Sequence, residues 1–547
     1  MATCSSVDGL IPKTKRPNVL LIVVDDVGFA ELGAFGSEIP TPNIDALANS
    51  GIKLTNFHTA PTCSPTRSML LSGVDSHIAG LGNMFEELSP NQKGQPGYEG
   101  YLHERVAPLP AIFKESGYRT YMAGKWHLGL EQGQGPTDRG FDRAFAILQG
   151  GAGHFGDMAA LFHNEPGSLG KAKYSNDGEL LEELPDNFKY SSEFYVDQML
   201  EYLSEGEQEE PFFAYLSFTA PHWPLQAPAE TIAKYKGKFD EGYEQVAERR
   251  LARQIQLGLI PELAKLSARP DDAPAWDSLS AEQRDISARA KEIYAAMLDE
   301  VDSHTGRLLD HLRSTGELDN TIVVFMSDNG SEGHDIDGLF PEEHFPKARE
   351  WLLASHKFDL ESMGGPGSYV LYGQGWGWAA APAFRGYKAY VTQGGTRVPA
   401  FVHYPKLMQT ENAISNALLS VKDVAPTLLE LTNIKQPGDN FKGQEVVRMT
   451  GASFAPVLEG EPYDTSNRIL GLELFGKRSI RHGEWTLVEM FEPQGTGEWQ
   501  MYYLGIDLAE RFDVSDQFPE QFDAMKAMWE QYAEENGVII PDWNSGY

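Results

Sequence analysis

Two pairs of oxygen-bearing side chains follow apolar runs that lie about 300 residues apart in the chain. Asp25 and Asp26 come directly after one run, and Asp328 and Asn329 come directly after the other. Ligands of parallel sheets bind beyond the carboxyl ends of the strands, so strand pairing would bring both pairs to one rim. Carboxylate and amide oxygens suit Ca²⁺ or Mg²⁺ rather than a soft metal. Each pair alone is weak evidence, because such residues also cap helices and begin turns.

Cationic side chains stand in several loops and after predicted strands. The segment GKWHLG contains Lys125 and His127, APHWP holds His222 between two prolines, and Lys388 precedes a Gly-Gly turn. With Arg67 they form a candidate anion pocket, since Lys and Arg beside a metal ion suit a tetrahedral oxyanion ester. Taken singly, each of them is more often a surface lysine or a hydrogen-bonded histidine.

The segment PTCSPTRSMLLSG places Cys63 just before Arg67, in a chain whose other cysteine is Cys4. The residues alone leave three interpretations open. Cys63 is a small buried hydrophobe, a thiolate nucleophile near Arg67 at a helix start, or a site of covalent modification. Two cysteines in the whole chain exclude a disulfide scaffold.

The bulk composition limits the partners. The 547 residues include 79 Asp and Glu against 45 Lys and Arg, which gives a net charge of −34. Such a surface repels nucleic acid and anionic lipid, and no apolar run reaches the length of a membrane span, so we expect neither partner. The start of the chain lacks the apolar core of a signal peptide, which predicts a cytoplasmic protein. A periplasmic or secreted protein is the alternative if a signal has been removed.

The order of the elements predicts an α/β fold. Apolar runs typical of strands covered on both faces lie at 18–24, 211–218 and 320–327. Helical patterns alternate with them, at 41–51, 108–117 and 280–313. We expect a large mixed, mostly parallel sheet sandwiched by helices.

A polar stretch and a later change of pattern predict the domain organisation. Residues from about 226 to 290 indicate a helical insertion. After about residue 432, two segments have the pattern of antiparallel strands, and 519–537 is an amphipathic helix. We predict a main domain over 1–432, which contains the insertion, and a smaller C-terminal α+β domain with an antiparallel sheet over 433–547.

These segments resemble the type I sulfatases. The family signature, Cys-x-Pro-x-Arg followed by a Leu-rich turn that ends in Gly, matches residues 63–73. The resemblance continues, in order, through LLIVVDDVGF, TPNIDALANSGIKLTNFH, GYRTYMAGKWHLG, SFTAPHWPLQ, MSDNG and YKAYVTQGGTR, and more loosely through QMYYLGIDLAERFDVSDQFPE. It covers most of the chain and is strongest to bacterial arylsulfatases. It implies the alkaline-phosphatase-like form of the predicted fold and makes 1–432 the catalytic domain.

The resemblance implies hydrolysis of aryl sulfate monoesters, and also of alkyl ones, to inorganic sulfate and a phenol or alcohol. A dedicated maturation enzyme would oxidise Cys63 to formylglycine, whose hydrated aldehyde attacks sulfur, so that no thiol survives in the active form. A divalent cation, Ca²⁺ or alternatively Mg²⁺, would bind to the modified Cys63 together with Asp25, Asp26, Asp328 and Asn329.

The resemblance also assigns roles to the cationic side chains. Arg67 would hold the hydrated aldehyde, and Lys125 and Lys388 would bind sulfate oxygens. His222 would donate a proton to the leaving group, whereas His127 would orient or deprotonate the hydrated aldehyde when sulfate leaves.

Two other functions compete with this one. A phosphate or phosphonate monoester hydrolase of the same superfamily is the main alternative, because both kinds of ester present a tetrahedral oxyanion. Phosphatases with zinc use histidine ligands, which the predicted metal residues lack. A non-catalytic protein that captures sulfated ligands would need a lost nucleophile or a lost metal ligand, and neither loss is present.

The nature of the leaving group is open from the sequence. Trp376 and Trp378 form either an apolar wall facing an aromatic ring or a buried turn. His154 lies in a Gly-rich segment that is a further candidate for a loop near the substrate.

Overall fold

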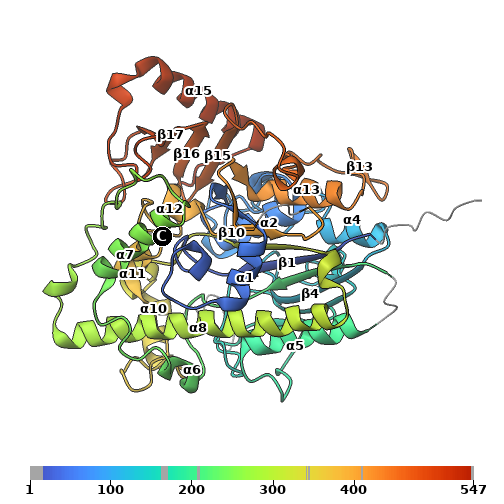
Figure 1. Cartoon of the computed structure of the whole chain (residues 1–547), viewed down its shortest axis with the longest axis horizontal. Coiled ribbons are helices and arrows are strands. Elements are labelled where there is room, and N and C mark those ends of the chain that lie inside the picture. Colours follow the sequence, from blue (N-terminus) through green and yellow to red (C-terminus); the bar gives the residue numbers. More distant parts are fainter. Residues whose placement is uncertain are drawn as a thin grey trace, which may run out of the picture.

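A ten-stranded sheet forms the centre of the protein in the computed structural model, which describes residues 16–161, 170–205, 210–340, 342, 345–407 and 411–543 (Figure 1). In spatial order its strands are β11 (Ala413–Ser415), β2 (Ile52–Leu54), β10 (Ala400–His403), β9 (Thr321–Ser327), β1 (Asn18–Val24), β8 (Phe212–Ser217), β4 (Arg119–Lys125), β5 (Arg143–Ile147), β6 (Tyr174–Asn176) and β7 (Glu179–Leu181). The five central strands from β9 to β5 are parallel, and β10 and β6 pair antiparallel at either side. The predicted mixed, mostly parallel sheet is confirmed.

Helices cover both faces of the sheet because the side chains of its strands alternate. In β1, Leu20 and Ile22 pack into one buried cluster, whereas Leu21 and Val23 pack into the other. The first cluster lies under α1 (Pro42–Ser50), α5 (Ser191–Ser204) and α8 (Ala281–Ser314), and the second under α2 (Cys63–Ser72), α4 (Leu109–Glu115) and α13 (Val424–Leu431). Strands buried on both faces are uniformly apolar for this reason.

The helix boundaries follow the local signals in the sequence. Thr41 is the N-cap of α1 and Pro42 is its first residue. The long helix α8 begins after Ser280, whose side chain accepts a hydrogen bond from the Gln283 amide in a complete capping box. Between β8 and α8 lie α6 (Ala229–Ala233), α7 (Tyr243–Gln256) and the short helix η4 (Trp276–Ser278).

A second, antiparallel sheet, formed within residues 469–503, lies at the top of Figure 1. Its strands, in order, are β15 (Ile469–Leu474), β16 (Lys477–His482), β17 (Trp485–Glu489) and β18 (Gln500–Tyr503). Helix α15 (Pro519–Asn536) packs on it through Met525 and Trp529. The predicted small α+β unit with an antiparallel sheet is therefore confirmed, whereas the division at residue 432 stays a prediction.

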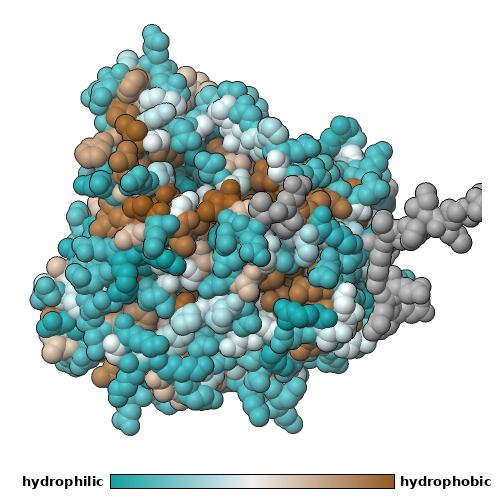
Figure 2. All heavy atoms as spheres, viewed as in Figure 1, coloured by the Kyte–Doolittle hydropathy of each residue, from teal (hydrophilic) through white to brown (hydrophobic). Residues whose placement is uncertain are grey.

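Hydrophilic residues cover most of the face drawn in Figure 2, and hydrophobic ones gather where the C-terminal unit meets the body below it. Within the described part of the chain, no helix combines the length and the apolar character that crossing a membrane requires.

Candidate active site

Strand register brings the predicted chemical residues to one edge of the large sheet. Val24 at the end of β1 pairs with Ser327 at the end of β9, so Asp25 and Asp328 leave neighbouring strands at the same level. On the other side of β1, β8 connects to β4, which ends at Lys125. The Lys125 Nζ atom accordingly lies 2.7 Å from Asp25 Oδ2.

The residues that follow β1 and β9 are buried and are hydrogen-bonded to one another. Asn329 Nδ2 donates to Asp26 Oδ1 at 2.6 Å, and the Asp26 amide donates to Asp328 Oδ1 at 3.4 Å. Burial raises the pKa of Asp25, and it raises the pKa of Asp26 to about 8. Burial acts on Asp328 too, but the charges of Arg67 and Lys125 outweigh it and lower the pKa of Asp328. The cluster therefore needs cationic charge to hold all its carboxylates ionised.

Arg67 supplies part of that charge from the first turns of α2. Its Nη2 and Nε atoms donate to Asp328 Oδ2 at 2.7 and 3.0 Å, and Nη1 donates to Ser217 Oγ and, at 3.0 Å, to the Lys125 carbonyl. Both members of the Arg67–Asp328 pair are fully buried, so removing either would leave an unpaired buried charge, at a cost of about 3–5 kcal/mol. These bonds make Arg67 a fixed part of the site's framework.

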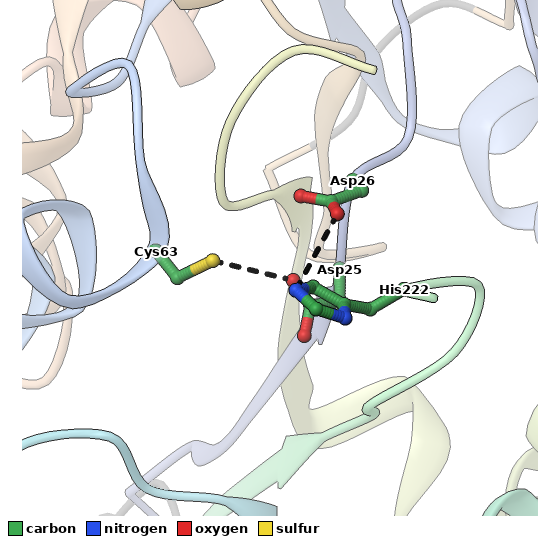
Figure 3. Close-up of side chains that lie close together, drawn as sticks. All are labelled: Asp25, Asp26, Cys63 and His222. Atoms are coloured by element: carbon green, nitrogen blue, oxygen red, sulfur yellow. Dashed lines mark hydrogen bonds and ion pairs between the residues drawn. The ribbon is translucent and has the colours of Figure 1, made fainter. Parts of the chain in front are cut away.

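Cys63 is the first residue of α2 and points at Asp25 (Figure 3), with its Sγ atom 3.5 Å from Asp25 Oδ1. Burial raises the pKa of the Cys63 thiol well above its ordinary value, and the charge of Asp328 raises it further. A thiol in this state is protonated and a poor nucleophile. The thiolate interpretation is therefore disfavoured, which leaves the small buried hydrophobe and the site of covalent modification.

His222 approaches the acidic residues from the loop after β8 (Figure 3). Its Nδ1–H donates to the Trp223 carbonyl at 2.6 Å, and its Nε2 atom lies 3.7 Å from Asp26 Oδ2. Burial and the charge of Lys388 lower the pKa of His222 well below 6.5, so its ring is neutral. His154 is buried behind this loop, where its Nε2–H donates to the His222 carbonyl at 2.9 Å. This hydrogen bond from His154 fixes the position of the loop that contains His222.

His127 has a partner, Glu86, that no local sequence pattern marks. Its Nε2–H donates to Glu86 Oε1 at 2.9 Å, and its buried Nδ1 has no hydrogen-bond partner among the described residues. Burial lowers the pKa of His127, and the carboxylate of Glu86 opposes that shift. The residue also has a positive φ of 55°, which is uncommon outside glycine. Nδ1 is therefore the ring atom that can take a proton.

Lys388 also has an unforeseen partner. Its Nζ atom lies 3.0 Å from Asp26 Oδ2 and 3.5 Å from Glu332 Oε2. Glu332 in turn accepts hydrogen bonds from Trp223 Nε1 at 3.3 Å and from His334 Nδ1 at 2.6 Å. Neither Glu86 nor Glu332 stands in a recognisable local pattern, and only their place in the fold gives them a role.

Four of the six predicted catalytic residues meet at a small cavity of about 50 Å³. Cys63, His127, His222 and Lys388 line it. Lys388 supplies a cationic group to the cavity, and the carboxyl groups of Glu86 and Glu87 also line it. Arg67 and Lys125 lie behind the cavity wall, where they bind Asp328 and Asp25.

The cavity borders a candidate metal site. Asp25, Asp26, Cys63 and His222 each offer a ligand atom, and these atoms lie within 4.8 Å of one another. Asn329 adds a buried Oδ1 with no hydrogen-bond partner among the described residues. Carboxylates of raised pKa beside an unsatisfied amide oxygen fit a hard divalent cation. His222 joins the predicted residues in this cluster, while Asp328 lies beside it, bonded to Arg67.

The chain is similar to known sulfatases over most of its length. The sulfatase family model matches residues 17–434. The chain belongs to the sulfatase family. An uncharacterized sulfatase of Schizosaccharomyces pombe is 41% identical over 538 residues, which cover 97% of this chain and 96% of that protein. An arylsulfatase of Klebsiella aerogenes is 38% identical over 449 residues, which cover 81% of this chain and 92% of that protein.

This sulfatase is thus a sulfuric ester hydrolase with an alkaline-phosphatase-like fold. The crystal structure of the phosphonate monoester hydrolase of Agrobacterium radiobacter has the same fold, with a TM-score of 0.57. It is 19% identical and covers 95% of this chain and 96% of that one. At this identity the likeness shows the fold alone.

Two tryptophans that were candidates for the substrate wall lie elsewhere in the sulfatase. Trp376 and Trp378 are buried in α11 (Gly373–Ala379), where their Nε1 atoms donate to Ser287 and Ser267. The aromatic-wall interpretation is wrong for this pair, because α11 packs against α7 in the core. Aromatic side chains from other segments line the catalytic cavity instead: Trp223, Phe340 and Phe345.

Proposed function

We propose that this sulfatase hydrolyses aryl sulfate monoesters, and alkyl ones more slowly, with a formylglycine made from Cys63 and one bound Ca²⁺. The observation that carries the proposal is the position of Cys63. Its protonated thiol lines a cavity with Lys388 and the two histidines, in the Cys-Ser-Pro-Thr-Arg sequence that a maturation enzyme would recognise. A nucleophile is needed at this point, and the thiol as such is unsuited to the task.

Asp25, Asp26, Asp328 and Asn329 would hold the cation, with the modified Cys63 completing its ligands. The cation would polarise a sulfate oxygen, and the hydrated aldehyde would supply a hydroxyl group as nucleophile. Mg²⁺ is the alternative, because the same oxygen donors suit it.

The side chains around the cavity would bind the sulfate and move protons. Lys125 and Lys388, which contact Asp25 and Asp26, would turn toward sulfate oxygens and offset their charge. His222 is neutral, so binding of an anionic ester would raise its pKa and let Nε2 carry a proton to the leaving oxygen. The Nδ1 atom of His127 would accept a proton when sulfate is released. Arg67 would keep Asp328 ionised.

Mass spectrometry and kinetics test the proposal together. Protein made with an active maturation enzyme should release a peptide in which residue 63 is about 18 Da lighter than cysteine. Cys63→Ala should fold, lack this mass change and lose turnover of 4-nitrophenyl sulfate. Thr66→Ser is the control, because it keeps the hydroxyl group that donates to the Ala60 carbonyl at 3.1 Å. This variant should retain both the mass change at residue 63 and the turnover of 4-nitrophenyl sulfate. Full turnover by protein that carries unmodified Cys63 would refute the mechanism.

Hydrolysis of phosphate or phosphonate monoesters is the second candidate, which the shared fold with a phosphonate monoester hydrolase favours. The phosphate and sulfate esters of 4-nitrophenol share one leaving group, so their kcat/KM values compare the two activities directly. We expect the sulfate ester to be the better substrate, and a higher kcat/KM for the phosphate ester would reverse the assignment.

A further inference from the structure

A second, larger cavity opens beside the catalytic one. It measures about 810 Å³ and shares five lining residues with the catalytic cavity: Glu86, His127, Gly150, Leu161 and Phe345. Because these residues form a common wall, a sulfate bound beside Cys63 would leave the rest of its ester in the larger space. The chemistry of the larger cavity should therefore select the leaving group.

Lysine side chains from two segments line this larger cavity: Lys93, Lys171 and Lys173. Lys171 and Lys173 belong to an extended segment that leads into β6. Ala172 and Tyr174 are buried, while Lys171 is exposed and Lys173 is half-buried. Side chains of an extended segment alternate between its faces, so the two lysines point to the same side.

Backbone pairing links Lys173 to the segment that packs on His127. The Lys173 amide donates to Gln149 Oε1 at 2.6 Å, and its carbonyl accepts from the Leu148 amide at 2.9 Å. Gly150, which follows Gln149 in the chain, packs tightly on His127. A Cβ atom added to Gly150 would lie 2.9 Å from the imidazole ring. Lys173 is thus linked to His127 through three consecutive residues, Leu148, Gln149 and Gly150. Both side chains line the larger cavity.

The charges on the wall leave the lysines available to a ligand. Glu99 is ion-paired with Arg105, and Glu86 hydrogen-bonds His127 at the catalytic end. Within the described part of the chain, Lys93 and Lys171 form no ion pair. The Nζ atom of Lys173 lies 3.5 Å from Glu131, an exposed residue, and such surface pairs contribute little. A cationic wall of this kind is notable on a protein with a net charge of −34.

We propose that Lys171 and Lys173, with Lys93, bind a second anionic group on the leaving group of the substrate. The inference rests on the proposed sulfate ester hydrolysis and narrows its substrates to esters that carry a further sulfate or carboxylate. Phe85, which is 47% exposed, and the half-buried Tyr101 also line this cavity and offer faces on which a sugar or aromatic ring can pack. The anionic group binds by charge and hydrogen bonds, so its contribution falls as salt rises.

Paired substrates test this subsite. A disaccharide with one sulfate and a disaccharide that carries the same scissile sulfate plus a second sulfate differ by the proposed contact alone. Wild-type enzyme should have a kcat/KM about tenfold higher for the disulfated substrate at low salt, and this ratio should shrink with added salt. A third arm with a carboxylate in place of the second sulfate distinguishes the two anions. Equal kcat/KM values in the mono- and disulfated arms would overturn the proposal.

A double variant, Lys171→Gln with Lys173→Gln, locates the contact. It should raise KM for the disulfated substrate about five- to tenfold, leave kcat close to wild type, and leave 4-nitrophenyl sulfate turnover within twofold. Lys435→Gln, at an exposed lysine away from both cavities, is the matched control and should change neither substrate. Equal losses on every substrate would show a structural role and refute the subsite.

A binding measurement separates this proposal from the proposed function. Cys63→Ala protein cannot turn substrate over, so calorimetry with the intact disulfated disaccharide measures binding alone. Affinity should fall about five- to tenfold when the two lysines are replaced in that background. If wild-type enzyme fails to hydrolyse 4-nitrophenyl sulfate, the proposed function fails, while a lysine-dependent affinity would still support the anion subsite. Affinity that is unaffected by the lysines would refute it.

Discussion

The Nε2 atom of His127 lies 2.9 Å from Glu86 Oε1, on the wall that separates the catalytic cavity from the larger one. The carboxylate fixes which ring nitrogen carries the proton, so the buried Nδ1 atom is the free base. Burial lowers the pKa of His127, and the charge of Glu86 opposes this shift by raising the pKa. Glu86 therefore acts through His127 as a positioning residue.

Replacing Glu86 by Gln should lower kcat about 10- to 100-fold with a smaller change in KM, because His127 loses its orienting partner. Glu86 raises the pKa of His127, so its loss should move the ionisation of that group in the pH–kcat profile to lower pH. The control is His127→Asn, combined with Glu86→Gln in a double-mutant cycle. If the loss of kcat in the double variant equals the product of the losses in the two single variants, Glu86 does not act through His127.

His222 and Lys388 should differ in their dependence on the leaving group. A general acid matters most when the leaving group is poor. His222→Ala should therefore damage alkyl and weakly acidic aryl sulfates far more than 4-nitrophenyl sulfate, whereas Lys388→Ala should slow all of them to a similar extent. A plot of log(kcat/KM) against leaving-group pKa measures both variants. If the slope for His222→Ala equals that of wild type while the slope for Lys388→Ala is steeper, Lys388 rather than His222 is the general acid.

Removal of the cation should reduce both activity and stability. Asp25 and Asp26 are buried carboxylates whose pKa values burial raises, so a bound divalent cation favours their ionised forms. At 100-fold excess over its Kd, a ligand of the folded state alone adds about 2.7 kcal/mol of stability. A chelator should lower Tm and abolish turnover, and Ca²⁺ should restore both better than Mg²⁺. Asn329→Ala should raise the Ca²⁺ concentration needed, and recovery with Zn²⁺ alone would contradict the oxygen-ligand assignment.

The contact between the C-terminal sheet and the body should weaken at alkaline pH. His77 lies between Asp75, at 2.8 Å, and Glu473 of β15, at 3.2 Å. Burial favours the neutral ring, but these two carboxylates outweigh it and raise the pKa of His77 to about 9. A raised pKa gives stability that is complete below the unfolded pKa of about 6.5 and is lost as pH rises through about 9.

Denaturant unfolding between pH 6 and pH 10 measures this contribution. The free energy of unfolding of wild type should exceed that of His77→Gln by about 3 kcal/mol near pH 6, and the difference should shrink through pH 9. Comparing the two proteins at each pH removes the effects of other titrating groups. A difference that stays constant up to pH 10 would show that His77 is not charged in the folded protein.

The framework of the site can be predicted from the sequence because the deciding interactions are local. Residues 19–24 and 322–326 are uninterrupted apolar runs, and such runs are typical of strands that are covered on both faces. Asp25 and Asp328 then stand at strand ends by position alone. The start of α8 was equally readable, because Ser280 and Gln283 form a capping box within four residues. Periodicity and capping depend on neighbours in the chain.

Only the tertiary structure decided which side chains meet. Glu86 contacts His127 across 41 positions, and Lys388 contacts Asp26 across 362. Nothing near Glu86 in the sequence marks it, whereas Trp376 looks like a substrate contact and is a core residue. Burial also set the chemistry, since it holds the Cys63 thiol protonated and His222 neutral. Desolvation and long-range charge depend on how the whole chain packs, so they are absent from any local pattern.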